Sequence, residues 1–227
     1  MKYLLSTFMI LNIFNGLAWA NDESPNFELG LGGGLLNSKA LFNLDVLLNI
    51  PLDEVYSTQV LLNSNYLMTG RSKDSFAQSE LASNWFARNE YGRLGVGIGI
   101  SELNPKDDNK ETDRSVVGRA MADVFWDAVT VTGNYTTYDS TLNNLSSTRV
   151  GASYYLTEDQ RVSVYRERYN DEAAWRLETY FQPEKYRQLA SIGIIARSGE
   201  DNDYLGVIAR YYFDTKVSLK ERERRFH

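Results

Sequence analysis

Arginines that recur at alternate positions along the chain are the residues best placed to do chemistry. Six of them share the polar side of alternating segments, namely Arg88, Arg93, Arg119, Arg149, Arg176 and Arg210. The same side carries four acids, Glu28, Asp45, Asp123 and Glu178, and three tyrosines, Tyr155, Tyr180 and Tyr212. Guanidinium groups on successive strands would attract anions. They would equally serve to neutralise the acids of a filled interior, because a buried charge needs a partner.

Histidine and cysteine offer little for catalysis. The chain has 1 histidine, the last residue His227, and 0 cysteines. A base-assisted nucleophile or a thiolate metal site therefore lacks its usual residues. We predict no catalytic residue, no metal site and no cofactor. Asp and Glu are abundant enough to leave a carboxylate-pair glycosidase open, but no pair is placed in a defined site.

Two further patterns admit a ligand but favour a structural role. The glycine-rich stretches Gly30–Gly34 and Gly95–Gly99 do not complete G-x-G-x-x-G, and no helix is expected after them. Glycine there lets a sheet curve and leaves interior space. Asp107, Asp108 and nearby Glu111 would suit a divalent cation, although a solvated loop is the favoured interpretation.

The first twenty residues have the features of a secretory signal peptide. Lys2 is followed by an apolar run over 3–14, and Ala18-Trp19-Ala20 forms an A-x-A cleavage site. The apolar run is short for a bilayer span and contains Asn12, so cleavage is favoured over a membrane anchor. We expect segment 1–20 to be a signal peptide and the exported chain to begin at residue 21.

Charge and hydropathy narrow the class of the exported chain. The net charge is −6, which argues against nucleic acid as a partner. The mean hydropathy is −0.40, and no later stretch is apolar enough for a transmembrane helix. A polar average does not exclude a membrane barrel, whose lumen and loops are polar.

The exported chain alternates between apolar and polar residues almost throughout. In one example, Leu94, Val96 and Ile98 interleave with Arg93, Gly95 and Gly97. This period of two predicts strands with one apolar face. About twelve strands of about ten residues each are expected, the length of a tilted membrane-crossing strand. They lie near 26–36, 39–50, 55–67, 79–89, 92–101, 115–126, 128–138, 145–156, 160–169, 172–182, 188–197 and 203–213.

Short and long connections alternate between these strands. The short ones lie at 51–54, 90–91, 126–127, 157–159 and 183–186, and the long ones at 69–78, 102–114 and 139–144. The connection at 37–39 is an exception, because it should be an outer loop and is short. Short periplasmic turns and longer outer loops are typical of outer-membrane barrels.

Together these features resemble those of a bacterial outer-membrane β-barrel protein, over the whole of 21–213. The expected fold is all-β, a transmembrane antiparallel up-and-down barrel of about twelve strands. The resemblance implies contact with outer-membrane lipid and lipopolysaccharide. It also implies recognition of Tyr204–Phe213 by the barrel insertion machinery, because Leu205, Val207 and Phe213 alternate and end on an aromatic residue.

The alternative fold is a soluble secreted β-sandwich, which also uses alternating strands. Its solvent face usually carries Lys, Glu and Thr, whereas here the polar face is rich in Gly, Asn, Ser, Tyr and Arg, as suits a wet, curved interior. Within the barrel class, size and interior arginines resemble those of small twelve-stranded porins for acidic sugars. We therefore expect passive diffusion of small, anionic solutes, with a non-conducting structural or interaction barrel of the envelope as the alternative.

The segment 214–227 follows the closing aromatic Phe213 and is rich in Lys, Arg and Glu. An even strand number places it in the periplasm. We expect a solvated or helical tail there. Docking to a periplasmic partner, or partial blocking of the pore, is the further hypothesis.

Overall fold

Twelve strands and one short helix make up the part of the chain that the computed structural model describes, residues 25–68, 75–106, 111–140, 145–170, 172–183, 185, 189–213 and 217–226. The signal peptide expected over 1–20 and the histidine His227 lie outside these residues. The elements are β1 (Asn26–Leu36), β2 (Lys39–Pro51), β3 (Tyr56–Met68), β4 (Phe76–Asn89), β5 (Gly92–Pro105), β6 (Asp113–Trp126), β7 (Val129–Ser140), β8 (Leu145–Thr157), β9 (Gln160–Tyr169), β10 (Glu172–Phe181), β11 (Ala190–Gly199), β12 (Tyr204–Tyr212) and α2 (Leu219–Phe226).

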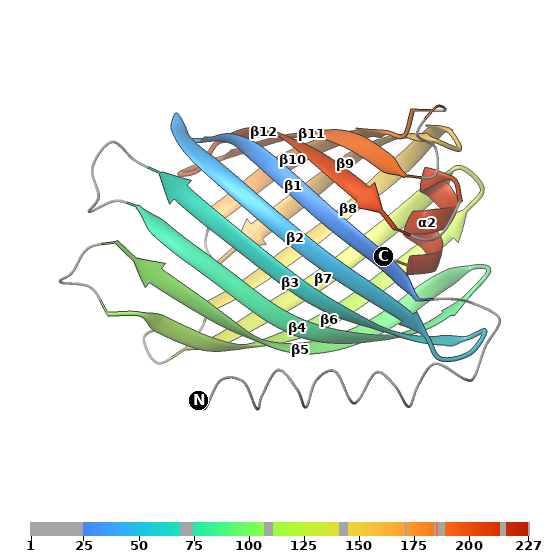
Figure 1. Cartoon of the computed structure of the whole chain (residues 1–227), viewed down its shortest axis with the longest axis horizontal. Helices are drawn as coiled ribbons and strands as arrows, with labels where there is room; N and C mark the ends of the chain where they lie inside the picture. Colours follow the sequence, from blue (N-terminus) through green and yellow to red (C-terminus); the bar gives the residue numbers. More distant parts are fainter. Residues whose placement is uncertain are drawn as a thin grey trace.

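The strands form one closed antiparallel barrel in which each pairs with its neighbours along the chain (Figure 1). β1 and β12 close it, in a register that runs from Glu28 opposite Tyr212 to Leu36 opposite Tyr204. Closure removes the free edges, so every strand has a hydrogen-bonding partner on both sides, as a lipid-embedded sheet requires. The predicted up-and-down barrel of twelve strands is confirmed.

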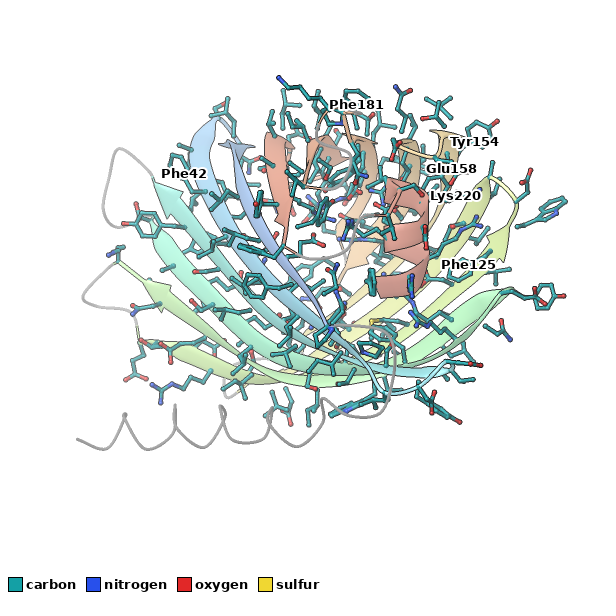
Figure 2. All side chains as sticks on the ribbon, turned by 45° about the vertical axis from the view of Figure 1, so that its right-hand side comes forward. Phe42, Phe125, Tyr154, Glu158, Phe181 and Lys220 are labelled. Carbon is teal, nitrogen blue, oxygen red and sulfur yellow. The ribbon has the colours of Figure 1, made fainter. Side chains whose placement is uncertain are left out.

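Side chains alternate across the barrel wall as the period of two predicts. In β5 the outward row Leu94, Val96, Ile98 and Ile100 is 55–67% exposed, whereas Gly95 on the inner row is buried. An exposed apolar row of this kind is stable only against lipid. Aromatic side chains flank the outward surface, with Phe42 toward one end of the barrel and Tyr154 toward the other (Figure 2).

Glycines on the inner face leave room for large rings from the neighbouring strand to lie over them. Gly193 lies opposite Tyr180, and a methyl group in its place would collide with that ring. Gly151 stands in the same relation to Tyr165 on β9. The glycines predicted to leave interior space therefore make room for rings from the neighbouring strand.

Tight turns fix the register at both ends. Asn37 and Ser38 join β1 to β2 with φ of 48° and 64°, the two left-handed residues of a type I′ hairpin. The turns at 52–55, 90–91, 127–128 and 158–159 all lie at the opposite end. We call this end the inner mouth, and the end that carries the β1–β2 turn the outer mouth.

The strands extend beyond their predicted bounds mainly toward the outer mouth. β4 begins at Phe76 and β5 ends at Pro105, where the sequence pattern placed 79 and 101. The extra residues, 76–78 and 102–105, mix apolar and polar side chains without a clear alternation, so hydropathy does not mark them, but they continue the backbone pairing, as Phe76 opposite Pro105 shows. None of the described helices is long and apolar enough to cross a membrane.

The alternation predicts a steep, position-dependent cost for charge on the outward row. Ile98→Arg, midway along β5, should lower the free energy of unfolding in lipid vesicles by about 2–4 kcal/mol. The same change at Val124, near the inner end of β6, should cost about 0–1 kcal/mol, because an arginine there reaches the interface. Urea titrations of both variants test this, and equal costs would contradict the lipid-facing assignment.

Candidate functional site

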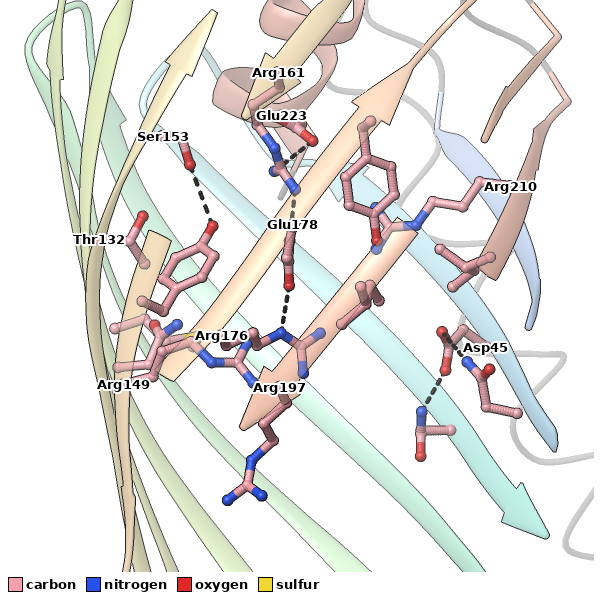
Figure 3. A pocket seen from close by; sticks show the side chains of 18 of the residues that line it. Asp45, Thr132, Arg149, Ser153, Arg161, Arg176, Glu178, Arg197, Arg210 and Glu223 are labelled. Carbon is pink, nitrogen blue, oxygen red and sulfur yellow. Dashed lines mark hydrogen bonds and ion pairs between the residues drawn. The ribbon is translucent and has the colours of Figure 1, made fainter. Parts of the chain in front are cut away.

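The barrel interior holds a polar cavity of about 830 Å³, lined by side chains from all twelve strands and from α2 (Figure 3). A second hollow of about 550 Å³ lies toward the outer mouth, where Arg119, Tyr138 and Arg149 line it. Charged and hydroxyl groups therefore dominate the interior. This cavity is the candidate functional site.

Three of the predicted inner arginines are paired with acids across the barrel wall. Arg93 Nη2 lies 2.5 Å from Asp123 Oδ2, its partner in the β5–β6 register. Arg119 on β6 donates to Glu80 on β4. Arg210 Nε lies 3.5 Å from Glu28 Oε1. At these positions the interpretation of mutual neutralisation describes the geometry, because each guanidinium has its own carboxylate.

Two further predicted residues, Asp45 and Arg88, have partners other than an oppositely charged side chain. Asp45 accepts hydrogen bonds from the amides of Asn43 and Asn63. Arg88, near the inner mouth, donates to the backbone carbonyl of Arg225 in α2. The structure thus places these two, like the three ion pairs, on the inside of the barrel.

A chain of alternating charges runs along the wall formed by β9, β10 and β11. Glu167 accepts from Arg149 Nε at 2.7 Å and from Arg197 Nε at 3.0 Å, and Arg176 Nη1 lies 3.9 Å away. Arg176 Nε then donates to Glu178 at 2.6 Å. Glu178 also accepts from Arg161 Nη2 at 2.7 Å (Figure 3). Three arginines thus surround Glu167, and Arg176 connects it to Glu178.

The series of alternating charges ends at the helix α2. Arg161 Nη1 donates to Glu223 Oε1 at 2.7 Å, and Tyr155 donates its hydroxyl proton to Glu223 Oε2 at 2.7 Å. We name the set Arg149, Arg161, Arg176, Arg197, Glu167, Glu172, Glu178 and Glu223 the charge chain. Arg197 Nη1, which lies 3.3 Å from Glu172 Oε1, completes it.

Several members of the charge chain did not emerge from the sequence analysis, namely Arg161, Arg197, Glu167, Glu172 and Glu223. The alternation contains the signal for Arg161 and Glu167, since both have the opposite parity to Val162 and Val164. On the same strand Arg166 faces outward, where its guanidinium carbon lies 5.1 Å from the Trp175 ring centroid.

Helix α2 begins with a capping box, Ser218-Leu219-Lys220-Glu221. Ser218 Oγ accepts a hydrogen bond from the Glu221 N–H at 3.2 Å. The N–H of Leu219 is 3.3 Å from Asp159 Oδ1, and that of Lys220 donates to the Glu158 carbonyl at 3.0 Å. The β8–β9 turn therefore satisfies the helix start, and Figure 1 shows α2 at the inner mouth.

One face of α2 is buried inside the barrel. Leu219 is fully buried against Tyr180, Ile195 and Ile208, which gives about 1.5–3 kcal/mol for an aliphatic side chain of this size. Phe226, about two helical turns further on, is also buried. The sequence analysis favoured a solvated or helical tail. Leu219–Phe226 is helical, but its apolar residues at this spacing bring it into the barrel rather than into solvent.

Arginines of α2 contact the barrel wall. Arg222 is fully buried, with its guanidinium carbon 3.7 Å from the Tyr212 ring centroid. Burial lowers the pKa of Arg222, and the Tyr212 and Glu28 groups oppose that shift. Arg224 donates to the carbonyls of Asp127 at 2.7 Å and Val129 at 2.9 Å.

Two acids that converge in the cavity share one arginine partner. Glu178 and Glu223 both bind Arg161, one on each amino group. A hydrolytic pair needs one carboxyl group free to give a proton and one free to attack or activate water, and these two are held as salt-bridge acceptors. Among the described residues, no group of three or more His, Cys, Asp or Glu could hold a metal ion, and the acidic loop around Asp107 falls partly outside them.

The buried pairs predict a contrast in stability. Asp123→Ala leaves Arg93 largely buried without its carboxylate, so it should lower the free energy of unfolding by about 3–5 kcal/mol. Glu102→Ala removes the partner of Arg114 on the outward surface, where that arginine side chain is 78% exposed, and should cost under about 1 kcal/mol. Denaturant titrations compare the two, and equal small losses would mean that water screens the inner pairs.

Comparison with known proteins identifies the fold through structure. No protein-family model matches the chain, and no curated protein matches it either. The KdgM porin in complex with disordered oligogalacturonate is similar with a TM-score of 0.63 at 9% identity, over 82% of this chain and 99% of that one. An outer membrane channel from Pseudomonas putida F1 gives 0.55 at 9% identity, over 83% and 94%.

A third similar structure is the translocator domain of the autotransporter NalP from Neisseria meningitidis, with a TM-score of 0.51 at 10% identity, over 94% of this chain and 96% of that domain. In this chain the matched part is the closed antiparallel barrel. At these identities the likeness establishes architecture. The chain has the fold of bacterial outer-membrane β-barrel proteins and resembles the small porins in its architecture.

Proposed function

We propose that this protein is an outer-membrane channel for small solutes, with a preference for anions. The observation that carries the proposal is the polar cavity of about 830 Å³ inside a closed barrel. Short turns mark the inner mouth as the periplasmic side. The KdgM porin, whose structure was determined with an oligogalacturonate, supplies a precedent for an acidic saccharide in a barrel of this shape.

The preference for anions rests on the charge around Glu167. Arg149, Arg176 and Arg197 all contact this carboxylate, and Arg176 and Arg197 also contact Glu178 and Glu172. The side chain of Arg149 is 39% exposed, and a guanidinium with an accessible face binds carboxylate or phosphate well. We therefore assign the selective region to this part of the charge chain.

Two surface contacts follow from an outer-membrane location. Arg166 and Arg168 are exposed on the outward surface toward the outer mouth, where phosphates of lipopolysaccharide would meet them. Tyr204–Phe213, with Leu205 and Val207 facing outward, would present the alternating aromatic-ended signal to the barrel insertion machinery. Neither contact requires a cofactor or a reaction.

A second function is favoured by a specific observation. Helix α2 occupies the inner mouth and contributes Glu223 and Arg224 to the cavity lining. A barrel that stays covered in this way would not conduct. It would then serve the envelope as a structural or interaction protein.

Bilayer recordings of the refolded full-length protein test the channel proposal. We expect an anion-selective reversal potential in a KCl gradient. The double change Arg149→Gln with Arg197→Gln should abolish that selectivity, because it leaves Glu167 with a single distant arginine. Arg114→Gln, an arginine on the outward surface, is the control and should change nothing. A folded barrel that passes no current, even with the contacts of α2 weakened, would favour the second function.

A further inference from the structure

We infer that α2 is a tethered plug, which covers the periplasmic mouth of the barrel and opens the cavity to the periplasm when it undocks. The effect on solute flux rests on the proposed channel function. The covering itself does not, and it is measured separately below.

Helix α2 bridges opposite walls of the barrel. The helix start is held by the β8–β9 turn, through the Glu158 carbonyl. The helix end is held by β3, where Gln59 Nε2 donates to the Phe226 carbonyl at 3.0 Å, and by Arg88 on β4. β3 and β9 are six strands apart in a ring of twelve, so they face each other. A helix that contacts both lies across the mouth.

Helix α2 docks in the inner mouth through specific contacts. Leu219 contacts an apolar cluster from β10, β11 and β12, Glu223 binds β8 and β9, and Arg224 contacts Val129 and Thr130 of β7. Walls on every side thus hold the helix in one position. A solvated tail would have no reason to match so many partners in both charge and position.

Most contacts between α2 and the barrel are polar contacts that water can replace. Apart from Leu219 and Phe226, α2 is held by ion pairs, by hydrogen bonds and by the stacking of arginines on rings. On undocking, Glu223 and the arginines of α2 pass into water, and Arg161, which lines the cavity, keeps Glu178 as its partner. Only residues 213–218 separate β12 from α2 in the sequence, so the helix stays attached to the barrel when it leaves the mouth.

Access to the cavity provides a test that does not depend on conduction. The chain has 0 cysteines, so Thr132→Cys, which lines the cavity, is the only thiol. In proteoliposomes of known orientation, a membrane-impermeant maleimide should label it quickly from the outer-mouth side and slowly from the inner-mouth side. Equal labelling from both sides in the full-length protein would overturn the plug.

Weakening α2 should remove this protection. Leu219→Asn with Glu223→Gln removes the apolar anchor and the acid that binds Arg161, without altering any strand. Glu221→Gln, on the exposed side of the same helix, is the matched control and should keep the protection. Heat-modifiable migration on a gel confirms that each variant forms a barrel. A weakened helix that protects as well as the native one would also overturn the plug.

A disulfide lock connects the plug to flux. Glu158→Cys with Lys220→Cys joins residues whose backbones share a hydrogen bond, and it should fix α2 in place. In the weakened background, current should be several-fold above the native level when reduced and should fall back when oxidised. Currents unaffected by the lock would contradict gating by α2. Asymmetric labelling without current in any variant would leave the plug standing and reject the channel.

Discussion

Every charge inside this barrel needs a partner, and that constraint organises the interior. The wall supplies arginines and acids on neighbouring strands, so Arg93 pairs with Asp123 and Arg149 with Glu167 directly across the register. Such pairs lower the cost of placing charge in a confined polar space. They also join adjacent strands on the side of the sheet that lipid does not reach. The outward row needs no such matching, because lipid takes apolar side chains directly.

The same constraint explains how α2 comes to belong to the barrel. Within the charge chain the strands contribute four arginines, Arg149, Arg161, Arg176 and Arg197, but only three acids, Glu167, Glu172 and Glu178. Glu223 supplies the fourth acid, from the tail. Removal of α2 would leave these strand residues one positive charge in excess, while Arg224, which also lines the cavity, would leave with the helix. The ion pair between Glu223 and Arg161 thus links the docked helix to the proposed selective region.

The sequence predicted the fold closely because a barrel is encoded by a short-range signal. Alternation located all twelve strands, and their bounds moved mainly where residues without a clear alternation, such as those at 102–105, extend the ladder beyond the apolar band. The parity of the site arginines followed from the same rule. Their partners did not, because pairs such as Arg119 with Glu80 depend on side-chain reach across the barrel. Blocking of the pore by the tail stood only as a further hypothesis, for a related reason. Its capping box is legible in Ser218 and Glu221, but the wall that Leu219 contacts comes from three distant strands.

The charged segment after Phe213 also differs from the strands in what it must match. A strand side chain that points outward meets lipid, and one that points inward meets other side chains at a fixed distance. Helix α2 meets a polar interior on one side and water on the other, so it can be rich in Lys, Arg and Glu and still be well packed, as the fully buried Arg222 shows. An apolar plug would bind the polar cavity poorly and would seek lipid or aggregate once it was released. A charged helix with one fully buried leucine at its start binds a polar wall in one position and stays soluble on leaving, which is the behaviour that a reversible cover requires.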